Sequence, residues 1–249
     1  MNQLTTSNIQ IHNGDLQIDA YLARPVGDEI YPAVMVVQEI FGVNAHIREV
    51  TERVAALGYV AIAPAIYQRI APGFETGYTA DDIKVGRQYK VQTKASELMS
   101  DLQATIDYLY ALPQVQQTGV GLIGFCFGGH VVYLGATLDA VTATASFYGA
   151  GIANWCPGKE RLATIEFTRD IKGEIYCFFG NEDASIPAEQ VAQIQSELEA
   201  HQVTHRIVCY DNAGHGFFCD RRGSYEPHAA SDAWEHVREL FRRVLRPSL

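Results

Sequence analysis

Three side chains, in the chain order Cys126, Asp183 and His215, are of the types that enzymes combine for nucleophilic catalysis. A thiolate attacks a carbonyl carbon, and an imidazole takes the thiol proton or holds the thiolate as an ion pair. A carboxylate fixes the imidazole tautomer and stabilises its charged form. The sequence therefore predicts cysteine-based acyl transfer, provided that the fold brings these three side chains together.

Cys126 lies at the centre of Gly124-Phe125-Cys126-Phe127-Gly128, after a short apolar run of strand type. This is the nucleophile-elbow pattern, with sulfur in place of the usual serine oxygen. The flanking glycines allow the strand and the following helix to approach closely around a strained middle residue. A thiol held there lies at a helix N-terminus, where backbone N–H groups favour negative charge and lower the thiol pKa.

Strands alternate with helices along the whole chain. An Asn13-Gly14 turn predicts a hairpin over 8–24, and Asn44 is expected to cap a helix that stops at Gly58. Residues 64–90 and 149–171 are expected to be irregular, with substrate-facing loops in the first segment. Buried strands are predicted at 32–37, 59–63, 141–148 and 175–179, and further strands at 120–123 and 204–210. Further helices are predicted around 98–109, at 187–200 and around 233–244. This alternation predicts one α/β domain, residues 1–249, with a mostly parallel sheet covered by helices on both faces.

Composition narrows the possible functions. The 249 residues are 47% hydrophobic and carry a net charge of −10, which argues against nucleic acid and anionic membranes as partners. No apolar run approaches the roughly 20 residues of a membrane span, and the N-terminus has no signal-peptide pattern. Five cysteines without a CxxC pair indicate a reduced, cytoplasmic protein. We expect a monomer or weak homo-oligomer that uses no cofactor.

The positions of the candidate acid and base support the catalytic interpretation. Asp183 follows the strand predicted at 175–179, and His215 follows the strand predicted at 204–210. In a parallel sheet these loops lie at the same edge as the elbow. Glu182 is the competing candidate for the acid.

The same stretches resemble the dienelactone hydrolase family (carboxymethylenebutenolidases), which has the α/β-hydrolase fold. The resemblance rests on 38–44, the elbow, Gly180-x-x-Asp183 and 213–217. It implies a triad of Cys126, His215 and Asp183, and a Glu39 that contacts the resting thiol and helps to form the thiolate when substrate displaces it. It further implies an oxyanion hole from the backbone N–H groups of Ile40 and Phe127, and hydrolysis of 4-carboxymethylenebut-2-en-4-olide to maleylacetate through a thioester.

The sequence departs from the family pattern at two positions near the expected substrate-binding residues. Family members hold the substrate carboxylate with arginine ahead of a Tyr-Lys pair, and here Arg87 precedes Tyr89 more closely than that pattern expects. Gly216 follows the histidine where a hydroxyl is usual. Arg87, Tyr89 and Tyr148 are the candidate substrate contacts, and Arg69 is an alternative cation. His201 and His205 have metal-ligand spacing but no adjacent carboxylate, so no metal is expected.

Two other functions stay open from the residues alone. A glutamine-amidotransferase-like enzyme also carries a cysteine on a strand-to-helix turn, but it usually has glutamate two residues after the histidine, where this chain has Phe217. A non-catalytic module could instead use Cys126 to sense oxidants. Ammonia release from glutamine would indicate the first, and easy sulfenylation without ester turnover the second.

Overall fold

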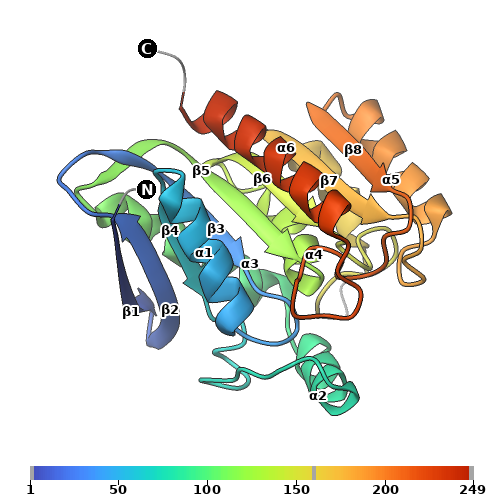
Figure 1. Cartoon of the computed structure of the whole chain (residues 1–249), viewed down its shortest axis with the longest axis horizontal. Coiled ribbons are helices and arrows are strands. Elements are labelled where there is room, and N and C mark those ends of the chain that lie inside the picture. Colours follow the sequence, from blue (N-terminus) through green and yellow to red (C-terminus); the bar gives the residue numbers. More distant parts are fainter. Residues whose placement is uncertain (1–2, 159–160, 247–249) are drawn as a thin grey trace.

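The computed structural model describes residues 3–158 and 161–246, and these fold around an eight-stranded sheet (Figure 1). The strand order is β1-β2-β4-β3-β5-β6-β7-β8. β1 pairs antiparallel with β2 and β2 with β4, whereas the other neighbours are parallel. The strands are β1 Leu4–Asn13, β2 Leu16–Pro25, β3 Tyr31–Val37, β4 Val60–Pro64, β5 Val115–Phe125, β6 Val141–Phe147, β7 Glu174–Gly180 and β8 His205–Tyr210.

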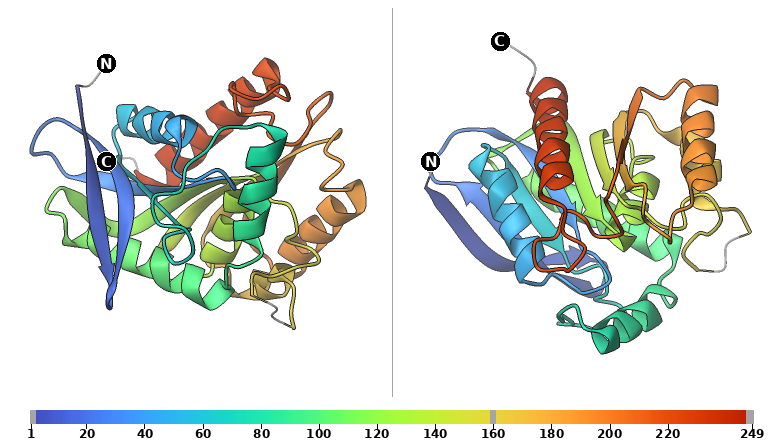
Figure 2. Two further views of the ribbon diagram at one scale, coloured as in Figure 1. Left: turned by 90° about the horizontal axis from the view of Figure 1, so that it is seen from below. Right: turned by 45° about the vertical axis from the view of Figure 1, so that its right-hand side comes forward.

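Helices cover both faces of this sheet. α1 and α6 lie on one face, and α3 with α5 lies on the other (Figures 1 and 2). α2 stands apart from both layers, beyond the carboxyl ends of the parallel strands. The helices are α1 Ala45–Ala56, α2 Ala80–Lys90, α3 Ala95–Ala111, α4 Phe127–Gly135, α5 Ala188–Ala200 and α6 Pro227–Leu245, with a 3₁₀ helix, η1, at Thr164–Asp170. This is an α/β-hydrolase fold, as the sequence predicts.

Local sequence signals account for the ends of several elements. The hairpin turns at Gly14 and Asp15, one residue later than the predicted Asn13-Gly14 turn, because Asn13 still pairs with Leu16 at the antiparallel edge of the sheet. The Asn44 side chain accepts a hydrogen bond from Ile47 N and so caps α1, and the positive φ of Gly58 (+88°) follows the end of that helix. Such ends can be predicted without knowledge of the tertiary structure. Each depends on a residue that satisfies a backbone hydrogen-bonding group, or permits a backbone angle, within one turn.

Two segments expected to be irregular contain helices. α2 forms within 64–90, where Thr79 and Asp82 make a reciprocal capping box. The prediction missed α2 because Gly86 is its one buried residue, so the helix shows no apolar stripe. η1 forms within 149–171, and its short 3₁₀ turns leave little periodicity to read.

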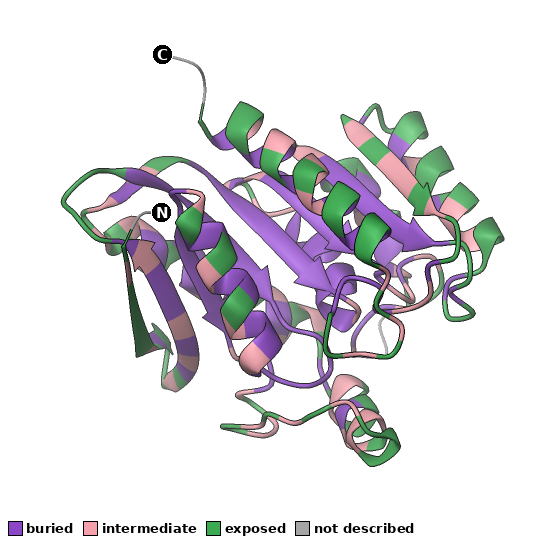
Figure 3. Ribbon diagram, in the orientation of Figure 1, coloured by how far each residue is buried: buried purple, intermediate pink, exposed green. Residues whose placement is uncertain are grey.

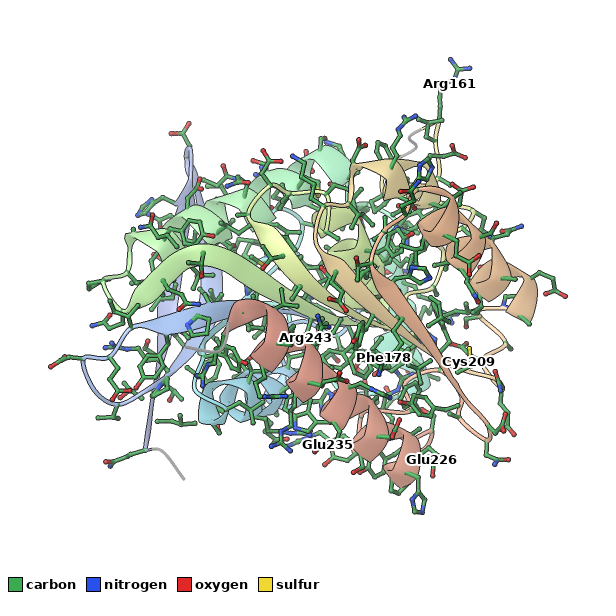
Figure 4. All side chains as sticks on the ribbon, turned by 90° about the horizontal axis from the view of Figure 1, so that it is seen from above. Arg161, Phe178, Cys209, Glu226, Glu235 and Arg243 are labelled. Carbon is green, nitrogen blue, oxygen red and sulfur yellow. The ribbon has the colours of Figure 1, made fainter. Side chains whose placement is uncertain are left out.

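The core lies on both faces of the central strands, which are buried along most of their length (Figure 3). The parallel strands β3 and β4 are buried at every position, because helices cover both of their faces. Phe178 of β7 is fully buried near α6, whereas Cys209 of the edge strand β8 is exposed (Figure 4). Within the described ranges, no helix combines the length and apolar character needed to cross a bilayer.

Candidate active site

The elbow holds Cys126 in a strained backbone conformation between β5 and α4. Its φ is +55° and its ψ is −115°, a region that L-residues rarely occupy. The flanking glycines are required by contact: a Cβ on Gly124 would lie 2.2 Å from Gly128 O, and one on Gly128 would lie 2.3 Å from Val37 O. Any larger residue would force the strand and the helix apart, so the two glycines keep Cys126 at the start of α4.

A continuous hydrogen-bonded row joins the three predicted side chains. His215 Nε2 lies 3.0 Å from Cys126 Sγ, and His215 Nδ1 lies 2.7 Å from Asp183 Oδ2. Asp183 is buried, and its other oxygen accepts a hydrogen bond from Ser185 N at 2.8 Å. Glu182, the competing acid, is exposed. The chain therefore uses the loops after β5, β7 and β8 to place thiol, carboxylate and imidazole in line.

The electrostatics of this row favour the charged forms of the thiol and the ring. Burial acts to raise the pKa of Cys126, but the charge and hydrogen bond of His215 outweigh it and leave the pKa below the ordinary thiol value. Burial acts to lower the pKa of His215, but the charge of Cys126 and the Asp183 hydrogen bond raise it to about 10. Both shifts have the sign expected for a thiolate beside an imidazolium.

A second buried carboxylate lies beside this row. Glu39 follows β3, and its Oε1 accepts a hydrogen bond from Arg222 Nη1 at 2.8 Å. Its Oε2 is buried without a hydrogen-bond partner among the described residues. Burial raises the pKa of Glu39 above the usual carboxyl range, although the charges of Arg222 and His215 act in the opposite direction. The negative charge of Glu39 also raises the pKa of Cys126, so the two groups interact across the site.

The backbone segments of Ile40 and Phe127 come together at the same place. Phe127 is the first residue of α4, so its N–H has no acceptor inside the helix. Gly128 packs its Cα against the carbonyls of Val37 and Gln38, which brings the start of α4 against the chain that leads to Ile40. The segment that leads to Ile40 and the first residues of α4 are therefore neighbours, as the predicted oxyanion hole requires.

Comparison with known proteins places the chain in a family. A family model described as "Dienelactone hydrolase family" matches residues 18–245. The chain belongs to the dienelactone hydrolase family. A curated Synechocystis protein named "Putative carboxymethylenebutenolidase" is 57% identical over 243 residues, which are 98% of each chain. The family resemblance, the fold and the assignment to hydrolases of ester or lactone bonds are thereby confirmed.

Two further relatives of this dienelactone hydrolase family member are informative. The crystal structure of a "Putative Dienelactone Hydrolase" from Klebsiella pneumoniae has a TM-score of 0.85 at 29% identity and covers 97% of this chain and 100% of its own. A Bradyrhizobium protein named "Probable 2-oxo-3-(5-oxofuran-2-ylidene)propanoate lactonase" is 28% identical over 90% of this chain and 88% of its own.

The predicted substrate contacts occupy three different settings. Tyr148 is fully buried, and its ring centroid lies 5.2 Å from that of His215. Tyr89 is half-buried in α2 and packs edge-on against Phe74, with 4.8 Å between ring centroids. Arg87 is exposed on α2. Of these three residues, Tyr148 is the one whose ring packs against the hydrogen-bonded row.

Two cations near Cys126, Arg222 and Lys90, are absent from the predicted set. Arg222 follows His215 by seven residues in an irregular loop, so no spacing rule indicates it. The glycine that follows His215, which departs from the family pattern, is the one sequence feature connected with Arg222. A Cβ on Gly216, whose φ is +86°, would lie 2.3 Å from Arg222 Nη1. The space beside the histidine is thus filled by the guanidinium that holds Glu39.

One group of side chains in the described part of the chain has metal-ligand spacing. Donor atoms of His46, Cys219 and Asp220 all lie within 4.8 Å of one another. Burial and the charges of nearby arginines, Arg53 among them, lower the pKa of His46 to about 4, against the attraction of Asp220. Because donor spacing is the one observation that points to a metal here, we assign no metal to the group. His201 and His205 bond instead to Glu197 and to the backbone.

Proposed function

We propose that the chain hydrolyses a small enol-lactone, of the dienelactone type, through a thioester on Cys126. The observation that carries the proposal is the hydrogen-bonded row from Cys126 Sγ through His215 to Asp183 at a strained elbow. The named relatives support the substrate class. Both carboxymethylenebutenolide and the propanoate in the Bradyrhizobium name are unsaturated five-membered lactones with an exocyclic double bond and a carboxylate.

The reaction begins with the thiolate. Cys126 Sγ attacks the lactone carbonyl carbon, and the carbonyl oxygen takes up the negative charge between the N–H groups of Ile40 and Phe127. The C–O bond of the ring then breaks, and the leaving enolate takes a proton from the His215 imidazolium. The result is a thioester on Cys126 and an enol that tautomerises to a ketone.

Deacylation returns the enzyme to its starting state. Neutral His215 takes a proton from water, which attacks the thioester carbon through a second oxyanion. The C–S bond breaks, the carboxylic acid product leaves, and thiolate and imidazolium are restored. Asp183 orients the ring throughout, because it accepts from Nδ1 and so keeps Nε2 directed at the sulfur.

Glu39 has a role in thiolate formation within this proposal. Its negative charge opposes the thiolate, and in the resting enzyme its Oε1 is held by the hydrogen bond from Arg222. In molecules in which Cys126 is still a thiol, substrate binding would displace Glu39 from Arg222 and release it toward the sulfur as a base. The unpaired Oε2 is the atom available to accept that proton.

The proposal is tested by dienelactone ring opening in single variants. Cys126→Ala and His215→Ala should each lose at least about a thousandfold in kcat/KM, since members of such a row act as a unit. Cys126→Ser should also fall steeply, because a serine hydroxyl is far less acidic than a thiol. An unchanged rate in Cys126→Ser would show that sulfur is not the attacking atom. A mass increase on Cys126 by one acyl group in quenched enzyme would identify the thioester.

The alternatives lack support. The position two residues after His215 is the fully buried Phe217, where an amidotransferase would place its glutamate. An oxidant-sensing module has no use for a buried Asp183 that orients the imidazole. Ammonia release from glutamine, or sulfenylation of Cys126 without turnover of any ester, would overturn the hydrolase proposal in favour of one of these.

A further inference from the structure

Two cations act on Cys126 in addition to His215, and they differ in their partners. Arg222 is held by Glu39 at 2.8 Å, so its charge is balanced inside the protein. Lys90 lowers the pKa of Cys126 by its charge, but it forms no ion pair with any carboxylate that the structure describes. Lys90 is therefore a positive charge at the site without a described acidic partner.

Aromatic rings hold the Lys90 ammonium on the side of the nucleophile. Its Nζ lies 4.8 Å from the ring centroid of Trp155 and 5.6 Å from that of Phe127, the residue directly after Cys126. Ring faces attract a cation, but they leave its hydrogen-bond donors unsatisfied. Burial lowers the pKa of Lys90 while the charge of Cys126 raises it, so the ammonium is partly removed from water and its charge interacts with that of the reacting sulfur.

The helix that carries Lys90 is fixed against the site. A Cβ on Gly86 of α2 would lie 2.4 Å from Ile40 O, so α2 packs directly on the segment expected to bind the oxyanion. Tyr67 bonds to Gly86 O at 3.3 Å and stacks on Phe127. Lys90, the last residue of α2, consequently has its backbone positioned by the same contacts that position the backbone around Cys126.

The other cations near α2 are less suited to meet a substrate anion. Arg69 is engaged by Asp101 through two hydrogen bonds of 2.9 and 2.7 Å. Arg87 is exposed one turn before Lys90. Position at the end of a helix would explain a basic residue at 90, because cations favour helix C-termini. It would not explain why Nζ lies over the rings of Trp155 and Phe127, the second of which directly follows Cys126.

We propose that Lys90 binds the carboxylate of the substrate and so selects anionic lactones over neutral ones. The inference rests on the proposed function, which it extends to the substrate's charge. The ammonium would exchange its ring contacts for a charge-assisted hydrogen bond to a carboxylate oxygen, while Trp155 and Phe127 flank the planar lactone. In this role Lys90 is a substrate-binding residue, which contacts the carboxylate and not the reacting carbonyl.

A matched pair of substrates tests this role: 4-carboxymethylenebut-2-en-4-olide as the free acid and as its methyl ester, which keeps the ring but removes the negative charge. In Lys90→Met we expect KM for the acid to rise about 10- to 100-fold, with kcat changed less, and kcat/KM for the ester to change by less than about threefold. Lys90→Arg should recover part of the affinity for the acid. Lys84→Met, an exposed lysine on the same helix, is the control for loss of a surface charge.

Other outcomes overturn the assignment. An equal loss on acid and ester in Lys90→Met would show that Lys90 supports the thiolate or the fold instead of the substrate anion. Loss of acid preference in Arg87→Met, with Lys90→Met unchanged, would assign the anion contact to Arg87.

A binding measurement separates this inference from the hydrolase proposal. The free acid is titrated calorimetrically into Cys126→Ala and into Cys126→Ala/Lys90→Met, where no turnover is needed. Binding that is 10-fold or more weaker in the double variant supports Lys90 as the anion contact even if the wild type proves unable to open the lactone. Equal binding in the two variants rejects it, whatever the wild type hydrolyses.

Discussion

Glu39 accepts a hydrogen bond from Arg222 at 2.8 Å across 183 residues of sequence. The Glu39 side chain is 1% exposed and that of Arg222 is 15% exposed, so the carboxylate is shielded from solvent and the guanidinium is largely shielded. It ties the loop after β3 to the loop that follows His215. The contact therefore links the expected oxyanion segment at Ile40 to the segment that delivers the imidazole.

Breaking this ion pair should lower the free energy of unfolding far more than breaking a neighbouring, exposed ion pair. In Arg222→Met the buried Glu39 loses its cation, and we expect about 3–5 kcal/mol of destabilisation by urea unfolding, or proton uptake by Glu39 that limits the loss. The matched control is Arg221→Met, whose partner Glu49 is half exposed; that variant should lose less than about 1 kcal/mol. Equal stability of the two variants would contradict the importance given to the buried pair.

Short sequence patterns predicted Cys126, Asp183 and His215, because their positions depend on local backbone geometry and on strand order. The glycines around Cys126 and the strand-terminal positions of Asp183 and His215 follow from backbone geometry and strand order, which a sequence displays directly. Arg222 and Lys90 could not be found in this way. Their proximity to Cys126 arises from packing between loops and helices that are distant in sequence, such as α2 against Ile40.

The pH dependence of kcat/KM should reflect the two shifted groups. Because His215 lowers the pKa of Cys126, the rate should rise with a midpoint below the ordinary thiol value of 9.0. Because the pKa of His215 is raised to about 10, the imidazolium that protonates the leaving group is lost only there, and the rate should fall above about pH 10. In Cys126→Ser the alkaline decline should disappear, since a neutral imidazole is then the required base. A wild-type rate that rises only above pH 9 would contradict the ion pair.

A single methyl group on α2 should impair catalysis without unfolding the chain. Gly86→Ala favours the helix by up to about 1 kcal/mol in intrinsic propensity, but the new Cβ would lie 2.4 Å from Ile40 O. Either α2, which carries Lys90, or the Ile40 segment, which is expected to bind the oxyanion, must therefore move. We expect a fall of about tenfold or more in kcat/KM with helical circular dichroism retained. Lys84→Ala, at an exposed position of the same helix, should leave the rate unchanged; equal rates in both variants would show that α2 does not position the site.

Alkylation by iodoacetamide at pH 7 should distinguish Cys126 from the other thiols without any knowledge of the substrate. Thiolates are the reactive form, and Cys126 is the cysteine whose pKa His215 lowers. Burial raises the pKa of Cys177 and brings that of Cys219 to about 11, so these two should stay unmodified in the folded protein. Cys209 is the informative comparison, because it is exposed yet its pKa is raised by partial burial and by Asp211.

Peptide mass spectrometry over time should therefore show Cys126 modified first, about tenfold or more ahead of Cys209. His215→Ala should abolish that lead, because the ring supplies the charge that stabilises the thiolate. If exposure alone decided reactivity, Cys209 would be modified first in both proteins, and the pairing of sulfur and imidazole would have no chemical effect in the resting enzyme.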